Sequence, residues 1–325
     1  MSDSARYLDL VVAGNITLDD TILPGARCIE NAPGGDALYA AIGARLWGIR
    51  VGIFSRVGED YPELHLKEIQ QVGIDISGIR RCTGPTVHYR ILYESANDRQ
   101  FIHITPPGRL AELSPESADL PPTYRSAAVY HVAAMPTLLQ TALFADFTQH
   151  GATVSLDPYE EDVAEYIDAL LDMFHQGITF LPSELEVGLI LEALGNADSR
   201  RDPFDAAAWF CEQGCQLVSI KLGEMGSLTR LADDERLYRL PALSTRVVDP
   251  TGAGDAFCGG FLAGMILYSS PLLAAACGTV SASLVIEDFG AMHALRPFHR
   301  ERDQRLYRLL SSAGLERSSK PWEKN

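Results

Sequence analysis

"VVDPTGAGDAFCGGFLAG", residues 247–264, places one carboxylate, Asp255, inside a run of five glycines. Those glycines are Gly252, Gly254, Gly259, Gly260 and Gly264. The run matches neither familiar glycine-rich phosphate loop. A dinucleotide-binding G-x-G-x-x-G loop would need glycine at Phe257, and a P-loop would need lysine where Gly260 stands. A third arrangement is needed, in which glycines approach an anion and a carboxylate lies beside it.

The glycine-rich stretch predicts a site for phosphoryl transfer. A helix is expected to begin near Gly254, after a strand-like segment "TRVVD" at 245–249. The first N–H groups of a helix have no partner within it, so the backbone of Gly252, Ala253 and Gly254 is predicted to form an anion hole. Asp255, in the first turn, can accept the proton of a hydroxyl that attacks the bound phosphate. The alternative is that Asp255 only caps the helix.

Composition narrows the class of protein. The chain has 325 residues, 46% of them hydrophobic, and a formal net charge of -16, which argues against broad nucleic-acid binding. No apolar run approaches the roughly 20 residues of a membrane helix, and the start of the chain lacks the pattern of a signal peptide. We therefore expect no membrane or nucleic-acid partner. The six cysteines have no neighbouring histidine ligands, so we expect reduced thiols in a cytoplasmic protein.

Strand-like and helix-like runs alternate along the chain. This pattern predicts an α/β fold with a mostly parallel, doubly wound sheet covered by helices on both faces. The expected strands are 8–14, 51–58, 127–133, 152–157, 177–181 and 216–223, and the clearest helices are 36–48 and 62–73. Residues 1–315 are expected to form one domain, followed by a polar tail at 316–325.

Two segments break this alternation. Residues 16–35 and 83–105 alternate apolar and polar side chains, and the second contains a hairpin signal at Asn97-Asp98. Both are expected to form antiparallel strands outside the main sheet, as a small lid. Because ligands of such folds bind at the carboxyl ends of the parallel strands, the residues that follow the strands are expected to meet the glycine-rich stretch there. Those residues are Asp19, Gly34-Gly35-Asp36, Asp157 and Gly223.

The stretch "DPTGAGDAFCGGFLAG" resembles the C-terminal signature of the ribokinase (PfkB) family of carbohydrate and nucleoside kinases, and the resemblance covers nearly the whole chain. It implies an α/β sheet with a β lid, magnesium-ATP as the phosphate donor and, in many members, a monovalent cation such as K⁺. It also implies a homodimer formed through the lid.

Four further motifs carry the resemblance and the roles that it implies. "GNITLD" (14–19) assigns Asp19 to substrate hydroxyls, and "GGDALYAAIGARLWG" (34–48) places Gly34, Gly35, Asp36 and Tyr39 at the substrate site. "KLGEMGSL" (221–228) places Lys221, Gly223 and Gly226 near the nucleotide. "LPSELE" (181–186) puts Glu186 at the glutamate that organises magnesium through water, and Asp249 and Thr251 match the start of the cation loop.

The departures from the family pattern lie mainly at the substrate end. Tyr39 stands where the family usually has asparagine, Asp36 stands where many members have lysine or a small polar residue, and Ser183 replaces the asparagine of N-x-x-E. Asp36 also lies where a helix N-cap is expected. The leading hypothesis is an ATP-dependent kinase that phosphorylates a hydroxyl of a small sugar or polyol. A nucleoside kinase, with Tyr39 against a base or ribose, and a catalytically silent binding paralogue are the alternatives.

Overall fold

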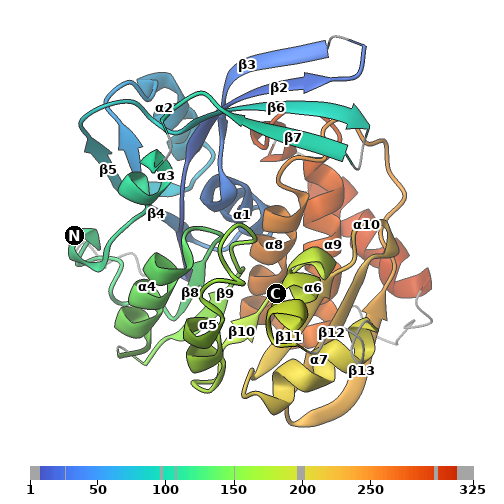
Figure 1. Cartoon of the computed structure of the whole chain (residues 1–325). Helices are drawn as coiled ribbons and strands as arrows, with labels where there is room; N and C mark the ends of the chain where they lie inside the picture. Colours follow the sequence, from blue (N-terminus) through green and yellow to red (C-terminus); the bar gives the residue numbers. More distant parts are fainter. Residues whose placement is uncertain are drawn as a thin grey trace, which may run out of the picture.

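A nine-stranded sheet forms the centre of the molecule (Figure 1). The computed structural model describes residues 8–25, 27–95, 98–106, 108–149, 151–195, 202–295 and 299–312, so the polar tail and Asn97 lie outside it. The strands in sheet order are β13 (Asp234–Leu240), β12 (Ser227–Leu231), β11 (Leu217–Lys221), β10 (Thr179–Phe180), β9 (Thr153–Leu156), β8 (Val129–Val132), β1 (Leu10–Ala13), β4 (Val51–Gly58) and β5 (Asp75–Cys82). All neighbours from β11 to β5 are parallel, and only β12 and β13 are antiparallel, which confirms the predicted fold class.

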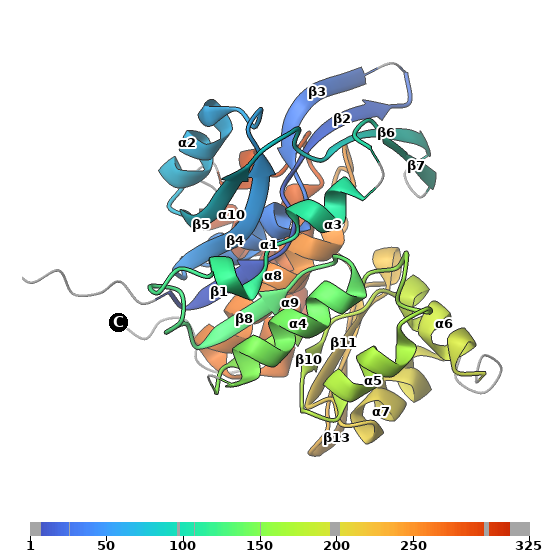
Figure 2. The ribbon, with the colours of Figure 1, turned by 60° about the vertical axis from the view of Figure 1, so that its left-hand side comes forward.

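Helices cover both faces of this sheet (Figures 1 and 2). One layer contains α1 (Asp36–Arg45), α2 (Glu63–Gln71), α8 (Ala253–Tyr268), α9 (Pro271–Val285) and α10 (His299–Ser312). The other contains α4 (Thr137–Gln149), α5 (Ile167–Phe174), α6 (Glu184–Ala193) and α7 (Pro203–Glu212). Because strand side chains alternate between faces, Leu10 and Val12 of β1 enter the first core and Val11 and Ala13 the second. The central strands are therefore apolar on both faces, as a buried parallel sheet requires.

The later glycines of residues 247–264 allow helices to pack closely. A Cβ at Gly259 of α8 would lie 1.8 Å from the carbonyl oxygen of Ala40 in α1. A Cβ at Gly264 would lie 2.6 Å from the Cα of Ala274 in α9. The glycine run thus has two functions, because its second half fixes the position of α8 and only its first half lies at the candidate phosphate site.

The lid is a separate four-stranded sheet above the carboxyl ends of the main strands (Figure 1). Its order is β3 (Arg27–Gly34), β2 (Thr17–Leu23), β6 (His88–Ser95) and β7 (Asp98–His103). The expected segments form it, as two antiparallel hairpins, but β2 and β6 pair in parallel. The expectation of purely antiparallel strands was wrong because β2 follows β1 and β6 follows β5. Both segments leave the main sheet at the carboxyl ends of its strands, so β2 and β6 run in the same direction in the lid.

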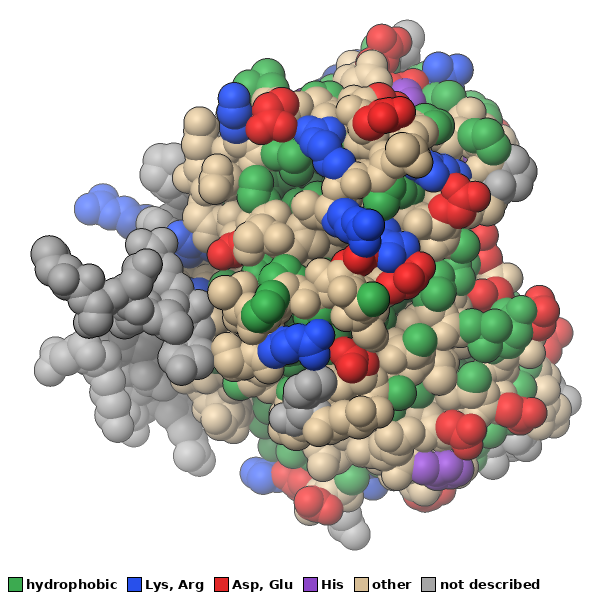
Figure 3. Space-filling view, turned by 90° about the vertical axis from the view of Figure 1, so that its left-hand side faces the viewer, with side chains coloured by type: hydrophobic (Ala, Val, Ile, Leu, Met, Phe, Trp, Pro, Cys, Tyr) green, Lys and Arg blue, Asp and Glu red, His purple; other side chains and the backbone are tan. Residues whose placement is uncertain are grey.

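The surface formed by α2, β5 and the short helix α3 (Arg109–Leu113) carries basic and acidic side chains side by side (Figure 3). Arg80 of β5, for example, forms an ion pair with Asp119. Within the described residues, no helix is both long and apolar enough to cross a bilayer.

We expect Gly259→Ala to lower the free energy of unfolding by about 2 kcal/mol or more, because the added methyl group would collide with α1 backbone that cannot rotate away. Gly188→Ala in α6 is the matched control. A Cβ at this exposed position meets nothing within 4 Å, so the substitution should stabilise the helix by about 0.5–1 kcal/mol. Urea unfolding of both variants measures the difference, and equal stabilities would contradict the packing argument.

Candidate active site

A pocket of about 410 Å³ lies between the lid, the carboxyl ends of the main strands and the start of α8. Twelve of the fifteen predicted site residues line it: Asp19, Gly35, Asp36, Tyr39, Glu186, Lys221, Gly223, Thr251, Gly252, Ala253, Gly254 and Asp255. Gly34, Gly226 and Asp249 are not among the lining residues. The fold therefore brings together residues that are more than 200 positions apart in the sequence.

The start of α8 forms the predicted anion hole. Gly252 is the N-cap, with a left-handed φ of 72°, and the helix begins at Ala253. A Cβ at Gly252 would lie 2.1 Å from the ring of Tyr39, so both the backbone angle and the space require glycine. The preceding segment 245–249 is not a strand, contrary to expectation. The amides of Val248 and Asp249 donate to the carbonyl of Ile286 instead, at 2.7 and 3.2 Å.

Asp255 projects from the first turn of α8 into the pocket. Its carboxylate lies close to its own backbone amide in the first turn, and among the described residues it accepts no hydrogen bond from another residue. Burial, reinforced by the charge of Asp157, raises the pKa of Asp255 to about 7, while Lys221 and Arg99 partly oppose this shift. The side chain is available to accept a proton near neutral pH.

Asp19 and Asp36 lie on the lid side of the pocket. The Oδ1 atom of Asp19 accepts a hydrogen bond from the Thr17 hydroxyl at 2.7 Å, and its Oδ2 atom lies 1.8 Å from where a Cβ at Gly34 would be. Gly34 therefore makes room for this carboxylate. Burial raises the pKa of Asp19 to about 7. Burial and the charge of Asp255 raise the pKa of Asp36 well above its ordinary value. Gly35, with φ 93°, is the N-cap of α1, so the alternative that Asp36 is the cap was wrong.

A buried ion pair joins two strand ends beside the anion hole. The Lys221 ammonium, at the end of β11, lies 2.7 and 2.6 Å from the two carboxylate oxygens of Asp157, which follows β9. It also lies 3.7 Å from the Cys258 sulfur. Burial alone would lower the pKa of Lys221, but Asp157 and its neighbours outweigh burial and raise it well above its ordinary value. A Cβ at Gly254 would lie 3.6 Å from the ammonium nitrogen. The cation is thus next to the space where a phosphate would bind.

Glu186 has a structural contact as well as a place in the pocket. Its Oε2 atom accepts a hydrogen bond from the Ser183 amide at 2.6 Å, and the Ser183 hydroxyl accepts one from the Glu186 amide at 3.3 Å. This reciprocal pair is a capping box at the start of α6. Burial and Asp157 raise the pKa of Glu186 to about 8, against the opposing charge of Lys221.

Gly223 and Gly226, on the nucleotide side, are glycines for different structural reasons. Gly223 lines the pocket, and a Cβ there would meet nothing within 4 Å, although its φ of 55° is left-handed. Gly226, with φ 93°, packs so that a Cβ would lie 2.0 Å from the carbonyl oxygen of Leu240. Gly223 leaves open space, whereas Gly226 allows the turn between β11 and β12.

Asp249 has one carboxylate oxygen without a partner. Its Oδ1 atom accepts hydrogen bonds from the Thr251 amide at 3.0 Å and the Thr251 hydroxyl at 2.6 Å. Its Oδ2 atom is buried and has no hydrogen-bond partner, and the residue is only 2% exposed. A buried carboxylate oxygen in this state is costly unless a cation or a water satisfies it. The residues therefore fit the cation that the resemblance implies.

Several pocket residues were missed by the sequence analysis. Asp157 was expected at the carboxyl ends of the strands, and it does line the pocket, but no role was assigned to it. The lid contributes Tyr89, Ile91, Arg99 and Phe101. The rings of Tyr89 and Phe101 meet edge to face at 5.8 Å. The alternation of apolar residues in β6 placed one face of that strand inward, but only the tertiary structure shows that this face covers the pocket.

Known proteins resemble this chain in sequence and in fold. A sequence model of the pfkB family of carbohydrate kinases matches residues 4–297. A cytidine kinase of Thermococcus kodakarensis is 32% identical over 259 residues, which is 79% of this chain and 88% of that relative. A 2-dehydro-3-deoxygluconokinase of Bacillus subtilis is 26% identical over 272 residues, covering 78% of this chain and 81% of the relative.

Two solved structures have the same fold. An Escherichia coli protein described as a ribokinase II, in complex with ATP and Mg²⁺, gives a TM-score of 0.76 at 22% identity, over 93% of this chain and 99% of that one. A Burkholderia thailandensis nucleoside kinase in complex with inosine gives 0.75 at 18% identity with the same coverage. The chain belongs to the PfkB family and is a phosphotransferase that acts on an alcohol group.

We expect Asp255→Asn to stabilise the ligand-free protein in a pH-dependent way. A carboxyl group whose pKa rises from 3.8 to about 7 on folding contributes stability below pH 4, and that contribution is lost as the pH rises through 7. Asparagine does not ionise, so the melting temperature of the variant should exceed that of the parent by roughly 3 °C or more at pH 8, and by clearly less at pH 4.5. Asp172→Asn, at an exposed position on α5, should show no such trend. A constant difference between Asp255→Asn and the parent at both pH values would contradict the assigned pKa.

Proposed function

We propose that this protein transfers the γ-phosphoryl group of ATP to a hydroxyl group of a small acceptor, with Asp255 as the general base. The observation that carries the proposal is the carboxylate of Asp255, which lines the pocket one residue after the last amide of the anion hole. A base with a pKa near the working pH combines the correct protonation state with a useful affinity for the proton. A binding protein without catalytic activity would have no use for this carboxylate.

The donor side of the pocket supports magnesium-ATP. The amides from Gly252 to Gly254 and the Lys221 ammonium would hold the phosphates. Magnesium is commonly held by one or two carboxylates together with substrate phosphates and water, and Glu186 can supply such a carboxylate. Among the described residues, no three acidic, histidine or cysteine side chains form a metal cluster of their own. The ATP and Mg²⁺ bound to the similar Escherichia coli protein support this donor. The free Oδ2 atom of Asp249 would bind K⁺.

The acceptor side favours a nucleoside. Asp19 would orient the acceptor hydroxyl, and Tyr39 fills the space against Gly252. Tyr89 and Phe101 give the lid an aromatic surface against which a planar base can stack. The similarity to a cytidine kinase supports this class, and the similarity to a 2-dehydro-3-deoxygluconokinase keeps a free sugar or sugar acid as the second candidate.

The outer face of the lid supports the homodimer that the resemblance implies. Side chains alternate along β7, so Ile102 points away from the pocket when Phe101 faces it. Ile102 and Ile104 are 43% and 45% exposed, and contact between two lids would cover them.

Asp255→Asn should reduce kcat by about 10²-fold or more in an assay that measures ADP release, because the variant keeps the shape of the side chain but cannot accept the proton. Binding of a nonhydrolysable ATP analogue should remain within about threefold of the parent. A variant with near-parental turnover would overturn the assignment of the base. The acceptors in the assay are cytidine, adenosine, inosine, ribose, fructose and 2-dehydro-3-deoxygluconate.

If the acceptor is a nucleoside, Phe101→Ala should raise its KM by roughly tenfold or more, because base stacking on an aromatic ring contributes about 1–3 kcal/mol. Leu267→Ala is the matched control, since it removes a similarly exposed apolar side chain near the end of α8, away from the pocket. Turnover of free sugars with no measurable nucleoside phosphorylation would instead establish the second candidate.

A further inference from the structure

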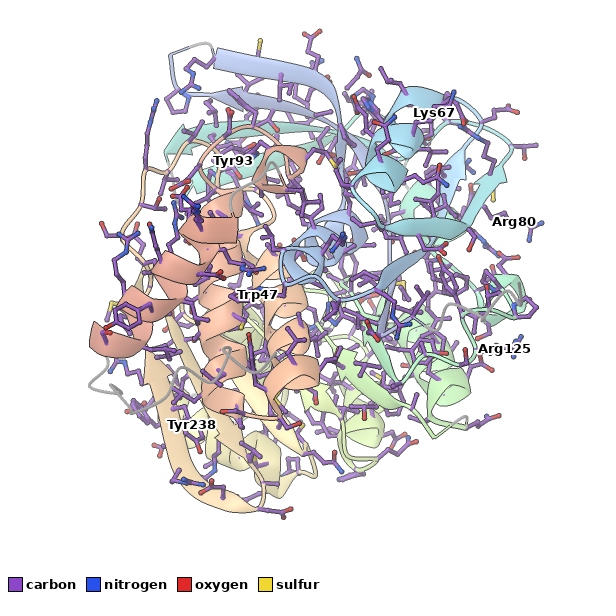
Figure 4. The ribbon with its side chains drawn as sticks, turned by 180° about the vertical axis from the view of Figure 1, so that it is seen from behind. Trp47, Lys67, Arg80, Tyr93, Arg125 and Tyr238 are labelled. Atoms are coloured by element: carbon purple, nitrogen blue, oxygen red, sulfur yellow. The ribbon has the colours of Figure 1, made fainter. Side chains whose placement is uncertain are left out.

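We propose that Tyr93, on lid strand β6, is a positioning residue that couples docking of the lid to the alignment of the loop 249–254. This inference rests on the proposed phosphotransfer, because that loop would hold the transferring phosphoryl group. The phenol hydroxyl of Tyr93 lies 2.8 Å from the Thr251 hydroxyl, a contact between positions 158 residues apart. Figure 4 labels Tyr93 on the lid, on the side that faces the helices below.

The lid packs against two segments near Asp249, one that contains Val248 and one that contains Phe289. Leu23, Ile91 and Tyr93 form a small buried cluster, and Val248 and Phe289 pack against it. The guanidinium of Arg27, at the start of β3, lies over the Phe289 ring at 5.2 Å. Because Val248 and Asp249 both donate to Ile286, these two segments are joined to each other, and the lid contacts them as one surface.

The hydrogen bonds between lid and loop have a defined direction. The Thr251 hydroxyl donates its one proton to Asp249 Oδ1, at 2.6 Å. In the Tyr93–Thr251 contact, therefore, Tyr93 must be the donor and Thr251 the acceptor. The oxygen of Tyr93 is then free to accept, and the positive charge of Arg99 on β7 acts on this phenol. The result is a chain of contacts that runs from Arg99 through Tyr93 and Thr251 to Asp249, with hydrogen bonds at its last two steps.

Each end of this chain lies at a different part of the site. Arg99 lines the pocket beneath the lid, and its charge acts on Asp255 and Glu160. Asp249 carries the free Oδ2 atom, and Thr251 immediately precedes the N-cap Gly252. If the lid lifts, Thr251 loses the donor that holds its oxygen, and the backbone leading into the anion hole loses a buried contact. Coupling of this kind is reciprocal, so ligands at the loop must stabilise the docked lid.

The test compares the parent with Tyr93→Phe, which keeps the ring in its apolar cluster and removes only the hydroxyl. Hydrogen exchange is followed in β6 and in residues 249–256, with and without magnesium and a nonhydrolysable ATP analogue, in KCl and in N-methylglucamine chloride. In the parent, nucleotide with K⁺ should slow exchange in both segments by roughly fivefold or more. In Tyr93→Phe, residues 249–256 should still be protected, whereas β6 should exchange at the ligand-free rate.

Tyr130→Phe is the matched control, because it removes another buried tyrosine hydroxyl, one that donates to the Tyr124 carbonyl at 2.7 Å away from the pocket. It should lose some stability yet keep the protection of β6. Equal protection of β6 in the parent and in Tyr93→Phe would overturn the coupling, as would a parent whose loop is protected while its lid is unaffected. A parent in which neither segment responds would count against nucleotide binding itself, so the two proposals fail in different ways.

Discussion

The close approach of α8 to α1 and α9 is the constraint on which the site depends. Where Gly259 meets the carbonyl of Ala40, and Gly264 meets Ala274, no side chain separates the helices. A helix held by backbone contacts cannot shift without a collision, so its first turn has a fixed place at the carboxyl edge of the sheet. Tyr39 of α1 packs on the N-cap of α8 from the same contact region. The packing of the core therefore also determines the geometry of the anion hole.

The charges of the pocket follow from this burial. Asp19, Asp36, Asp255 and Glu186 are enclosed together, and burial is the largest cause of the upward pKa shift in each of them. These shifts reduce the stability of the ligand-free protein at neutral pH. The same shift makes Asp255 a better proton acceptor than a carboxylate in water. Burial of these carboxyl groups thus lowers the stability of the protein and also makes Asp255 a base, a common relation between function and stability in enzymes.

The lid is joined to the main domain by a specific surface. Its inner face contributes aromatic side chains to the pocket, and one tyrosine reaches the loop before α8. The phosphate end and the acceptor end of the pocket consequently share a boundary at Thr251. Closure over an acceptor excludes water from the reacting groups. A direct contact between lid and loop would let the same movement align the phosphoryl group.

The sequence by itself determined the alternating α/β architecture, the two lid segments and the anion hole with Asp255, because periodicity and glycine-rich turns are local properties of the chain. The resemblance to the PfkB family supplied Tyr39, Lys221, Glu186 and Thr251 of the pocket. It did not predict β5, β12 and β13. β12 and β13 form a hairpin at the sheet edge, and only Leu228 and Leu240 of this hairpin belong to the buried apolar core. It gave no role to Asp157 and left out Arg99 and Tyr93, and the partners of these three residues are 64, 156 and 158 positions away. Only tertiary structure decided these contacts, because no local pattern in a chain records which distant side chain will satisfy a buried charge or hydroxyl.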